Sequence, residues 1–322
     1  MSALRLPAAF LPSLRCPHCR QPLIQESAAC FRCTAPNCGR EYPVVAGVPI
    51  LIDESRSVFN LEDFIARRDT YFRSRPGRLR ALRQKLLPSI SANIDSADHY
   101  RRLAQLLLER RERPQVLIIG GGILGEGMAP LLEQPALQLL ESDVSITSRT
   151  MLVCDAHDLP FADGTFDGIV AQAVLEHVVD PYRCVEEIHR VLAPDGLVYA
   201  ETPFMQQVHA GRYDFTRFTH LGHRRLFRHF EEIESGVICG PGMALAWAYR
   251  YFLLSFVSSP LLFRLVDVFA HLTAFWLKYL DPYLAQKPGA LDAASGYFFL
   301  GRRSTQILSD KELVRLYRGR MQ

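Results

Sequence analysis

Residues 154–204 read CDAHDLPFADGTFDGIVAQAVLEHVVDPYRCVEEIHRVLAPDGLVYAETPF, and the alternation within this stretch decides the fold. The apolar run GIVAQ from Gly168 predicts a buried strand, and LVYAET from Leu197 predicts the next one. Between them, the segment that ends in VLAPDG predicts a helix. Strands that alternate with helices in this way are typical of a parallel sheet flanked by helices.

The same alternation extends in both directions from this stretch. Further strands are predicted at QVLII (Gln115), LQLL (Leu137), MLVC (Met151), a weaker run near Ile233, and YFFLG (Tyr297). We therefore predict that residues 114–322 form one doubly wound, Rossmann-like α/β domain.

A glycine-rich loop, GGGILGEG, follows the strand predicted at Gln115. Glycines between a strand and a helix let a ligand approach bare backbone. Gly120, Gly122 and Gly125 match the dinucleotide-binding pattern G-x-G-x-x-G. Glu141 or Asp143 lies about 20 residues further on, where such folds bind a ribose hydroxyl. An NAD(P)-dependent oxidoreductase is therefore one interpretation of this loop.

The stretch from Cys154 to Phe204 resembles the class I S-adenosylmethionine-dependent methyltransferases, of the broad type that includes ubiquinone and small-molecule methylating enzymes. The resemblance rests on D-x-x-x-LPF-x-D-x-x-FD, then LEHV, then VLAPDG before a strand, and it covers most of residues 115–240. It implies a seven-stranded sheet whose last strand is antiparallel, and methyl transfer to an O, N or C acceptor. We favour it over an oxidoreductase, in which LPFADGTFD and LEHV have no role.

The resemblance also implies which residues bind the cofactor: Gly120, Gly121, Gly122, Glu141, Asp143, Asp155, Ala156, Gln172 and Ala173. In the family, the acid that matches Asp155 binds the adenine amino group, and the backbone at Ala156 receives the ring. The acid that matches Asp143 binds both ribose hydroxyls, with Glu141 as the fallback. The pair that begins with Gln172 lies under the methionine part.

Two residues depart from the family pattern. Ile118 stands where the family usually carries an acid, two residues before the first glycine, and Leu124 stands where its third glycine falls. The departures concern the loop that would hold the methionine carboxylate and amine. They leave open a catalytically inactive, methyltransferase-like scaffold.

A polar loop, FMQQVHAGRYDFTRFTHLGHRRLF, follows the strand predicted at Leu197. Open α/β sheets bind ligands at the carboxyl ends of their strands. We nominate His209 as a general base because imidazole titrates near neutral pH. The competing interpretation is that the loop only caps the sheet, and we interpret Glu176 and His177 of LEHV as packing residues. Four side chains of the loop are expected to contact the acceptor: Gln206, Tyr213, Asp214 and Arg217.

Five of the eight cysteines lie between Cys16 and Cys38. Two residues separate Cys16 from Cys19 and four separate Cys33 from Cys38, which is typical of the two knuckles of a tetrahedral zinc site. Cys30 has no matching knuckle and is the spare. A four-cysteine site has no open position for water, so we expect structural zinc, whose bond energy folds a segment too small to bury its own core.

This N-terminal module, residues 1–56, resembles the Trm112-like zinc domain through CPxC, the second cysteine pair and YPVVAGVPILI. The run from Tyr42 suits a short pair of strands. Members of that family are small scaffolds that stand alone or are fused to methyltransferases. The resemblance implies support for the neighbouring domain rather than chemistry, and the extra cysteine is its one departure.

Composition places few limits on the partners. The chain has 322 residues, 48% of them hydrophobic and 22% charged, which suffices for an α/β core and a smaller module. A net charge of +3 argues little for nucleic acid, so methylation of tRNA or a ribosomal component is a secondary alternative. No secretion signal is recognised at the start, and we expect a cytoplasmic protein with a small-molecule or lipid-linked substrate.

Residues 57–113 are predicted to form a basic helical linker, because Arg and Lys dominate the stretch from Arg67 to Lys85. This stretch is either a solvated face or a basic support for membrane contact.

The stretch from Trp247 to Leu284 is unusually apolar and aromatic. The thirteen residues between Arg250 and Arg264 are fewer than the roughly 20 that cross a bilayer, and Pro260 interrupts them. We predict a helical insertion at about 245–285 that acts as a lid or a homodimer face. Peripheral membrane contact is the alternative.

Overall fold

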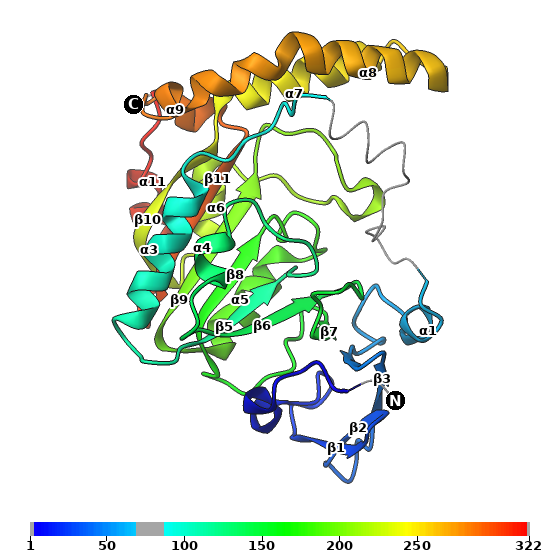
Figure 1. Ribbon diagram of the computed structural model, residues 1–322. Helices are drawn as coiled ribbons and strands as arrows, with labels where there is room; N and C mark the ends of the chain where they lie inside the picture. Colours follow the sequence, from blue (N-terminus) through cyan, green and yellow to red (C-terminus); the bar gives the residue numbers. More distant parts are fainter. Residues whose placement is uncertain (1–2, 69–86, 321–322) are drawn as a thin grey trace.

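A mixed β-sheet of eleven strands runs through the computed structural model, which describes residues 3–68 and 87–320 (Figure 1). The strand order is β1-β2-β3-β4-β7-β6-β5-β8-β9-β11-β10. The strands are β1 (Leu23–Ser27), β2 (Cys30–Cys33), β3 (Glu41–Val45), β4 (Val48–Leu51), β5 (Gln115–Ile119), β6 (Gln138–Asp143), β7 (Leu152–Cys154), β8 (Phe166–Gln172), β9 (Leu192–Pro203), β10 (Phe230–Cys239) and β11 (Gly296–Arg303).

The sheet has more strands than the seven that we predicted, because the N-terminal module continues it. Strands β5 to β11 supply seven strands, and β11 runs antiparallel to both β9 and β10. The strand β4 pairs in parallel with β7, with Ile50 opposite Val153 and Leu51 opposite Cys154. The module is therefore part of the same sheet and not a separate unit.

The strand pair predicted from Tyr42 is present as β3 and β4, which are antiparallel. Ala46 and Gly47 join them, both with positive φ (+52° and +81°). A two-residue turn with positive φ at both positions matches the twist of the strands that it connects.

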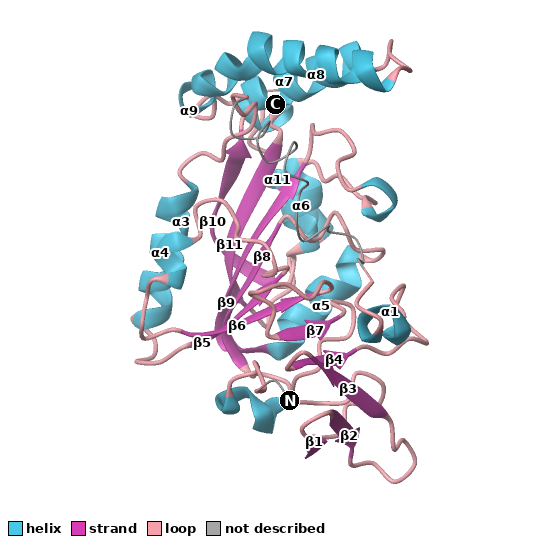
Figure 2. Cartoon of the chain, turned by 45° about the vertical axis from the view of Figure 1, so that its right-hand side comes forward, coloured by secondary structure: helices cyan, strands magenta, loops and turns pink. Residues whose placement is uncertain are grey.

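Helices flank the sheet on both faces (Figure 2). The helix α5 begins at Pro181, and the side chain of Asp180 accepts a hydrogen bond from the backbone N of Arg183 at its first turn. The helices are η1 (Ala8–Ser13), α1 (Leu61–Ile65), α3 (Ser96–Leu108), α4 (Ala129–Leu132), α5 (Pro181–Val191), η2 (Gly211–Tyr213), α6 (His220–Leu226), α7 (Pro241–Leu254), α8 (Pro260–Ala274), η3 (Phe275–Leu280), α9 (Asp281–Leu284), α10 (Ala290–Ala293) and α11 (Asp310–Arg315).

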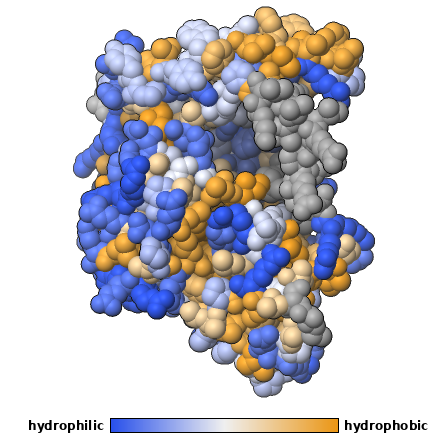
Figure 3. All heavy atoms as spheres, in the orientation of Figure 1, coloured by the Kyte–Doolittle hydropathy of each residue, from blue (hydrophilic) through white to orange (hydrophobic). Residues whose placement is uncertain are grey.

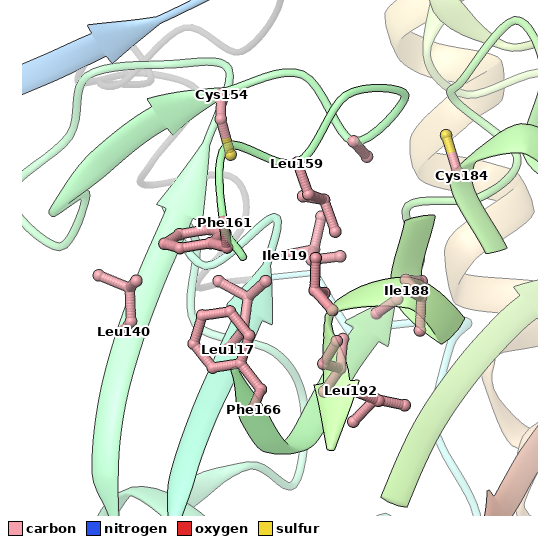
Figure 4. Close-up of a cluster of buried hydrophobic side chains, with 14 of the residues drawn as sticks. Leu117, Ile119, Leu140, Cys154, Leu159, Phe161, Phe166, Cys184, Ile188 and Leu192 are labelled. Atoms are coloured by element: carbon pink, nitrogen blue, oxygen red, sulfur yellow. The ribbon is translucent and has the colours of Figure 1, made fainter. Parts of the chain in front are cut away.

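The central strand β5 is buried on both faces, as its continuous apolar run predicts. Leu117 and Ile119 pack with Ile188 of α5 in the cluster that Figure 4 shows. Phe10 and Phe31 of the N-terminal module belong to the same cluster. The module and the α/β domain thus share one hydrophobic core.

The segment predicted as a linker contains a helix of the domain core. Tyr100, Leu103 and Leu107 of α3 are buried against Val116 and Ile118 of β5. This part of residues 57–113 therefore packs on the sheet and does not act as a spacer. Most of the basic stretch from Arg67 to Lys85 lies outside the described residues.

Residues 241–284 form a layer of helices across one end of the sheet (Figures 1 and 2). The helical run breaks between α7 and α8, just before Pro260, so the apolar run from Arg250 to Arg264 is interrupted as predicted. The helical stretch from Pro260 to Leu284 then continues for 25 residues and contains an 18-residue window with a mean hydropathy of 1.4. By length and composition this stretch could cross a membrane, so the sequence argument, which stopped at Arg264, was too narrow.

Candidate functional site

A cavity of about 450 Å³ opens at the carboxyl ends of the parallel strands β5 to β9. This is the edge where ligands bind in open α/β sheets. Eight of the residues predicted to bind cofactor or acceptor line it: Gly120, Asp143, Asp155, Ala156, Gln172, Ala173, Gln206 and His209.

The glycine loop lies close to the strands on either side of it. Gly120 has a φ of +75°, and a Cβ atom there would lie 2.6 Å from the side chain of Val174. A Cβ atom on Gly122 would lie 2.6 Å from Oδ2 of Asp143, the atom to which the backbone N of Gly122 donates at 2.9 Å. Gly121 and Gly122 do not line the cavity, whereas Gly120 does. The loop thus requires glycine at positions 120 and 122, where a Cβ atom would lie too close to a neighbouring side chain.

Of the two acids expected near the ribose, Asp143 lies at the cavity and Glu141 does not. Asp143 is buried, which raises the pKa of its carboxyl, and its Oδ1 accepts a hydrogen bond from the backbone N of Ser145 at 2.8 Å. Glu141 pairs with Arg149 outside the cavity. The position of these side chains favours Asp143.

Asp155 is held by two side chains. The ring Nδ1 of His157 lies 2.5 Å from Oδ1 of Asp155, and the hydroxyl of Ser57 donates to Oδ2 at 2.5 Å. Burial raises the pKa of Asp155, but the hydrogen bonds from His157 and Ser57 outweigh burial and lower it. The carboxyl therefore stays ionised at neutral pH and can accept further hydrogen bonds from a ligand.

The segment after the cysteine module contributes to the cavity, which sequence reasoning missed. Val58 and Phe59 line the cavity, and the ring of Phe59 stacks on Tyr213 with centroids 5.8 Å apart. Arg56 pairs with Asp158 on the far side of Ser57. No motif marks these residues, because only the pairing of β4 with β7 brings them to the cavity.

A second missed group lies at the end of β9. The buried carboxylate of Glu201 accepts hydrogen bonds from Gln172 Nε2 at 2.9 Å, Asn93 Nδ2 at 2.8 Å and the hydroxyl of Tyr199 at 2.7 Å. Burial raises the pKa of Glu201 to about 7. Glu201 and Asn93 both line the cavity. The sequence signal was present, because Glu201 ends the apolar run LVYAET.

The two departures from the methyltransferase pattern lie in different surroundings. Ile118 is 1% exposed and packs in the core under α3, so the strand offers no carboxylate there. Leu124 lines the cavity and is 54% exposed. An acid that lines the cavity from a neighbouring part of the sheet is Glu201 of β9.

Glu176, which we interpreted as a packing residue, is a buried acid in the cavity wall. It is 0% exposed, and neither carboxylate oxygen has a hydrogen-bond partner among the described residues. Burial raises the pKa of Glu176 to about 8, so the carboxyl is largely protonated at neutral pH. Its Oε1 lies 3.6 Å from Nε2 of His177.

His177 and His209 lie beside Glu176, with ring centroids 4.9 Å apart. Nδ1 of His177 donates to the carbonyl of Tyr213 at 2.9 Å, which leaves the lone pair on Nε2, toward Glu176. Burial, and next the charge of His209, lower the pKa of His177 to about 4. The ligand atoms of the three residues lie within 4.8 Å of one another, a spacing that a cation could bridge. A protonated Glu176 beside neutral histidines is better suited to hold or move a proton.

The predicted acceptor loop divides into two groups. Gln206 and His209 line the cavity, whereas Tyr213, Asp214 and Arg217 do not. Arg217 pairs with Asp214 and donates to the carbonyl of Gln206 at 2.8 Å. The ion pair therefore fixes the loop that carries Gln206 and His209. Of the four side chains predicted to contact the acceptor, Gln206 alone lines this cavity, and the roles of the other three stay predictions.

The cysteines of the N-terminal module converge on one point. The Sγ atoms of Cys16, Cys19, Cys33 and Cys38 all lie within 4.8 Å of one another. The Sγ atoms of Cys19 and Cys33 are 3.4 Å apart and those of Cys16 and Cys38 are 3.8 Å apart. Thiolates about 2.3 Å from a tetrahedral zinc ion lie roughly 3.8 Å from one another, so the cluster is compatible with zinc. Cys30 lies outside the cluster.

Comparison with known proteins finds matches to the middle of the chain. Residues 131–200 match the family described as methyltransferase domain. The ubiquinone biosynthesis O-methyltransferase of Pseudomonas aeruginosa is 34% identical over 97 residues, which cover 26% of this chain and 40% of that protein. The chloroplastic tocopherol O-methyltransferase of Arabidopsis thaliana is 30% identical over 92 residues, 29% of this chain and 26% of that protein. This chain thus matches less than half of each relative's length.

Solved structures of methyltransferases are also similar to this chain. The phosphoethanolamine N-methyltransferase 2 of Haemonchus contortus aligns with 65% of this chain and 53% of its own, at 15% identity and a TM-score of 0.39. The 1,6-didemethyltoxoflavin-N1-methyltransferase of Burkholderia thailandensis aligns with 64% and 78%, at 15% identity and a TM-score of 0.37. In sequence, the segment from α4 to β9 of this α/β sheet matches the methyltransferase domain.

Proposed function

We propose that this chain transfers a methyl group from S-adenosylmethionine to a small-molecule or lipid-linked acceptor. The observation that carries the proposal is that the segment matching the methyltransferase domain supplies Asp143, Asp155 and Gln172 to one cavity. When bound, S-adenosylmethionine supplies an electrophilic methyl group on a sulfonium.

The residues that line the cavity suit this cofactor. Asp143 would accept hydrogen bonds from the ribose hydroxyls, and Asp155 with the backbone at Ala156 would bind the adenine. Glu201 would accept from the ammonium group in place of the acid that is missing at Ile118, and Gln172 holds Glu201 in position. Each of these carboxylates would thus accept hydrogen bonds from a different donor of the cofactor.

His209 would act on the acceptor. Burial lowers the pKa of its imidazole, so the ring is neutral near pH 7 and can take a proton from an acceptor hydroxyl or amine. Glu176 beside it already holds a proton near pH 7, so the proton taken by His209 would leave to solvent from the partly exposed ring. Replacing His209 with glutamine should lower kcat about 100-fold or more with little change in cofactor affinity, if the acceptor must lose a proton.

The four-cysteine cluster would hold a structural zinc ion in a Trm112-like module. Its donor set and sulfur spacings support this assignment. A closed four-thiolate site has no position for a substrate, so its contribution is to fix the module. The segment that follows, with Ser57 and Phe59, is then held at the cavity.

Calorimetry with the zinc-loaded protein tests the proposal. S-adenosylmethionine and S-adenosylhomocysteine should bind to the wild type, and Asp155→Ala should weaken both by about tenfold or more, since a hydrogen bond to a charged group is lost. Asp310→Ala, at an exposed acid of α11, is the matched control and should change neither affinity. Binding of NADH alone would indicate an oxidoreductase, and binding of none of the three would indicate a scaffold.

A further inference from the structure

The helical stretch from Pro260 to Leu284 exposes a line of large apolar side chains. An α-helix brings residues three, four or seven apart onto one face. The residues of this line follow that spacing, and each is at least 51% exposed: Leu261, Leu265, Phe269, Leu272, Trp276 and Tyr283.

The preceding helix α7 adds to the same layer. Leu245, Phe252 and Phe256 are 56%, 62% and 73% exposed. Figure 3 shows the hydrophobic residues that gather along these helices, at the top of the molecule. Soluble monomers rarely expose apolar patches of this extent, and larger patches mark sites of interaction.

The opposite side of α8 is already packed. Ala270 and Ala274 are buried, and Asp267 is 0% exposed and lies 2.6 Å from Nε of Arg250 on α7. This ion pair fixes α8 on α7. Because the opposite side of α8 packs against α7, the exposed apolar side chains lie on the solvent side of a docked helix.

The charges on this layer have one sign. The two acids between residues 241 and 291, Asp267 and Asp281, are 0% and 1% exposed. The basic residues Arg264 and Lys287 are exposed, and Nζ of Lys287 lies 4.4 Å from the ring centre of Tyr283. Apolar and aromatic residues with flanking cations suit the headgroup region of an anionic bilayer.

A second copy of the chain fits this face less well. A twofold dimer would bring the same patch of each chain together, including its cations. Both acids of the layer itself are buried, and the exposed Asp292 beyond it already accepts hydrogen bonds from the hydroxyl of Tyr317 and the backbone N of Arg320. Anionic headgroups supply the missing negative charge.

The stretch is also better suited to lie on a bilayer than to cross it. Arg264, Asp267, Lys278 and Asp281 lie along it, and each would be costly in hydrocarbon. The chain enters the layer from β10 and returns to the same sheet at β11. Both ends of the layer are therefore on the same side as the α/β domain.

We propose that the outer face of the layer formed by α7, α8, η3 and α9 binds the surface of an anionic phospholipid bilayer. The layer would lie in the plane of the interface, with its apolar line below the headgroups and Arg264 and Lys287 among them. The layer borders the cavity, because α7 contributes Met243 to the cavity lining and the ring of Trp247 lies 6.2 Å from that of His209.

Vesicle flotation of the full, zinc-loaded chain tests this proposal without any methyl acceptor or cofactor. The wild type should float with vesicles of phosphatidylcholine that contain one third phosphatidylglycerol, and less with phosphatidylcholine alone. The triple variant Leu261→Ser, Phe269→Ser, Trp276→Ser should lose about 100-fold or more in partitioning, because three buried apolar side chains are removed from the interface. Arg264→Ser should lower binding to the anionic vesicles about fivefold and leave the neutral vesicles unchanged.

A matched triple variant is available elsewhere on the chain. Ile24, Ile65 and Val314 are 52%, 57% and 68% exposed, and their replacement by serine should leave flotation unchanged. Failure of the wild type to float with either vesicle would overturn the proposal, as would equal flotation of the Leu261 triple variant. A concentration-dependent dimer that this variant abolishes, with no vesicle binding, would assign the face to a second copy.

Discussion

The cysteine module and the helical layer are both additions to the same seven strands, but they differ in how far their large apolar side chains are buried. Phe10, Phe31 and Tyr42 of the module are 1–2% exposed and lie in the core that the module shares with the domain. In the helical layer, large side chains such as Phe256 and Leu261 are 73% and 67% exposed. The module therefore buries its large apolar side chains, whereas the layer exposes many of its own.

The difference in burial follows from the contacts that stabilise each addition. The module is short, so it extends the sheet through β4, shares the domain core and converges four cysteines on one point. The layer has an excess of apolar residues, and one helix face suffices to dock it. The cavity is bordered by Phe59, in the segment that follows the module, and by Met243 of the layer.

The largest effect is expected from loss of a cysteine of the cluster. Cys33→Ser should unfold the module, because structural zinc sites supply roughly 10–16 kcal/mol of binding free energy that is also folding free energy. Zinc content per chain and hydrogen exchange of β1 to β4 measure the result. Chelation of the wild type should reproduce it.

Cys30→Ser is the matched control, since Cys30 lies on the same strand as Cys33 but outside the cluster. It should keep one zinc per chain and full protection. Zinc retained by the Cys33 variant, or lost from the Cys30 variant, would contradict the assignment of the four clustered cysteines as the ligands that stabilise the module.

The next effect compares two neighbouring residues of the helical layer. Ala246 is 0% exposed and packs on Ile90 and Ala274, whereas Leu245 is 56% exposed. Ala246→Glu should cost roughly 5 kcal/mol, because it buries an unpaired carboxylate. Leu245→Glu should change the unfolding free energy by about 0.5 kcal/mol or less. Denaturant unfolding distinguishes the two, and equal stabilities would mean that α7 is not docked as described.

A smaller effect concerns Glu176, below the loop that the layer helps to hold. The hydroxyl of Tyr251 on α7 donates to the carbonyl of Val208, and the backbone N of Phe215 donates to that of Glu176. Burial raises the pKa of Glu176 from 4.5 to about 8. Between these pH values the folded state holds a proton that the unfolded state releases, so stability falls as pH rises, by on the order of 4 kcal/mol.

Glu176→Gln should therefore remove most of this pH dependence, with a gain in stability over the wild type that grows from pH 5 to pH 8. Thermal unfolding across that range measures it. Parallel pH profiles of the two proteins would show that the loop leaves Glu176 open to water. Phe256→Ser, on the exposed side of the layer, should leave the wild-type profile unchanged.

The smallest effect tests the link between the module and the cavity. Ser57→Ala removes the hydrogen bond to Asp155 and should lower the unfolding free energy by about 1.5–2 kcal/mol, since the acceptor is charged. Ser258→Ala, at an exposed serine of the helical layer, should change it by less than about 0.5 kcal/mol. Chemical denaturation compares the two variants. Equal unfolding free energies would show that the hydrogen bond from Ser57 does not link the module to the cavity.

Local patterns were enough for the order of strands and helices and for much of the cavity. Continuous apolar runs that alternate with helical stretches predicted β5 to β11, and the glycine loop marked the strand end at Gly120. The acids at Asp143 and Asp155 follow strands, so their place at the carboxyl edge could be predicted. The cysteine spacing predicted the cluster, because two knuckles must converge for any metal to bind.

Contacts between distant segments decided the rest. Nothing near Ser57 or Phe59 in the sequence indicates the cavity, because their position depends on the pairing of β4 with β7 about 100 residues away. Likewise, the apolar run from Trp247 could have formed part of a buried core. The ion pair between Asp267 of α8 and Arg250 of α7 decides which face of α8 is exposed to solvent. Sequence by itself determined which segments form strands and helices and which cysteines are spaced as metal ligands, since these depend on neighbours along the chain. Only the tertiary structure decided burial, and with it the pKa of Glu176 and the exposed face of α8, because burial depends on residues that are distant in sequence.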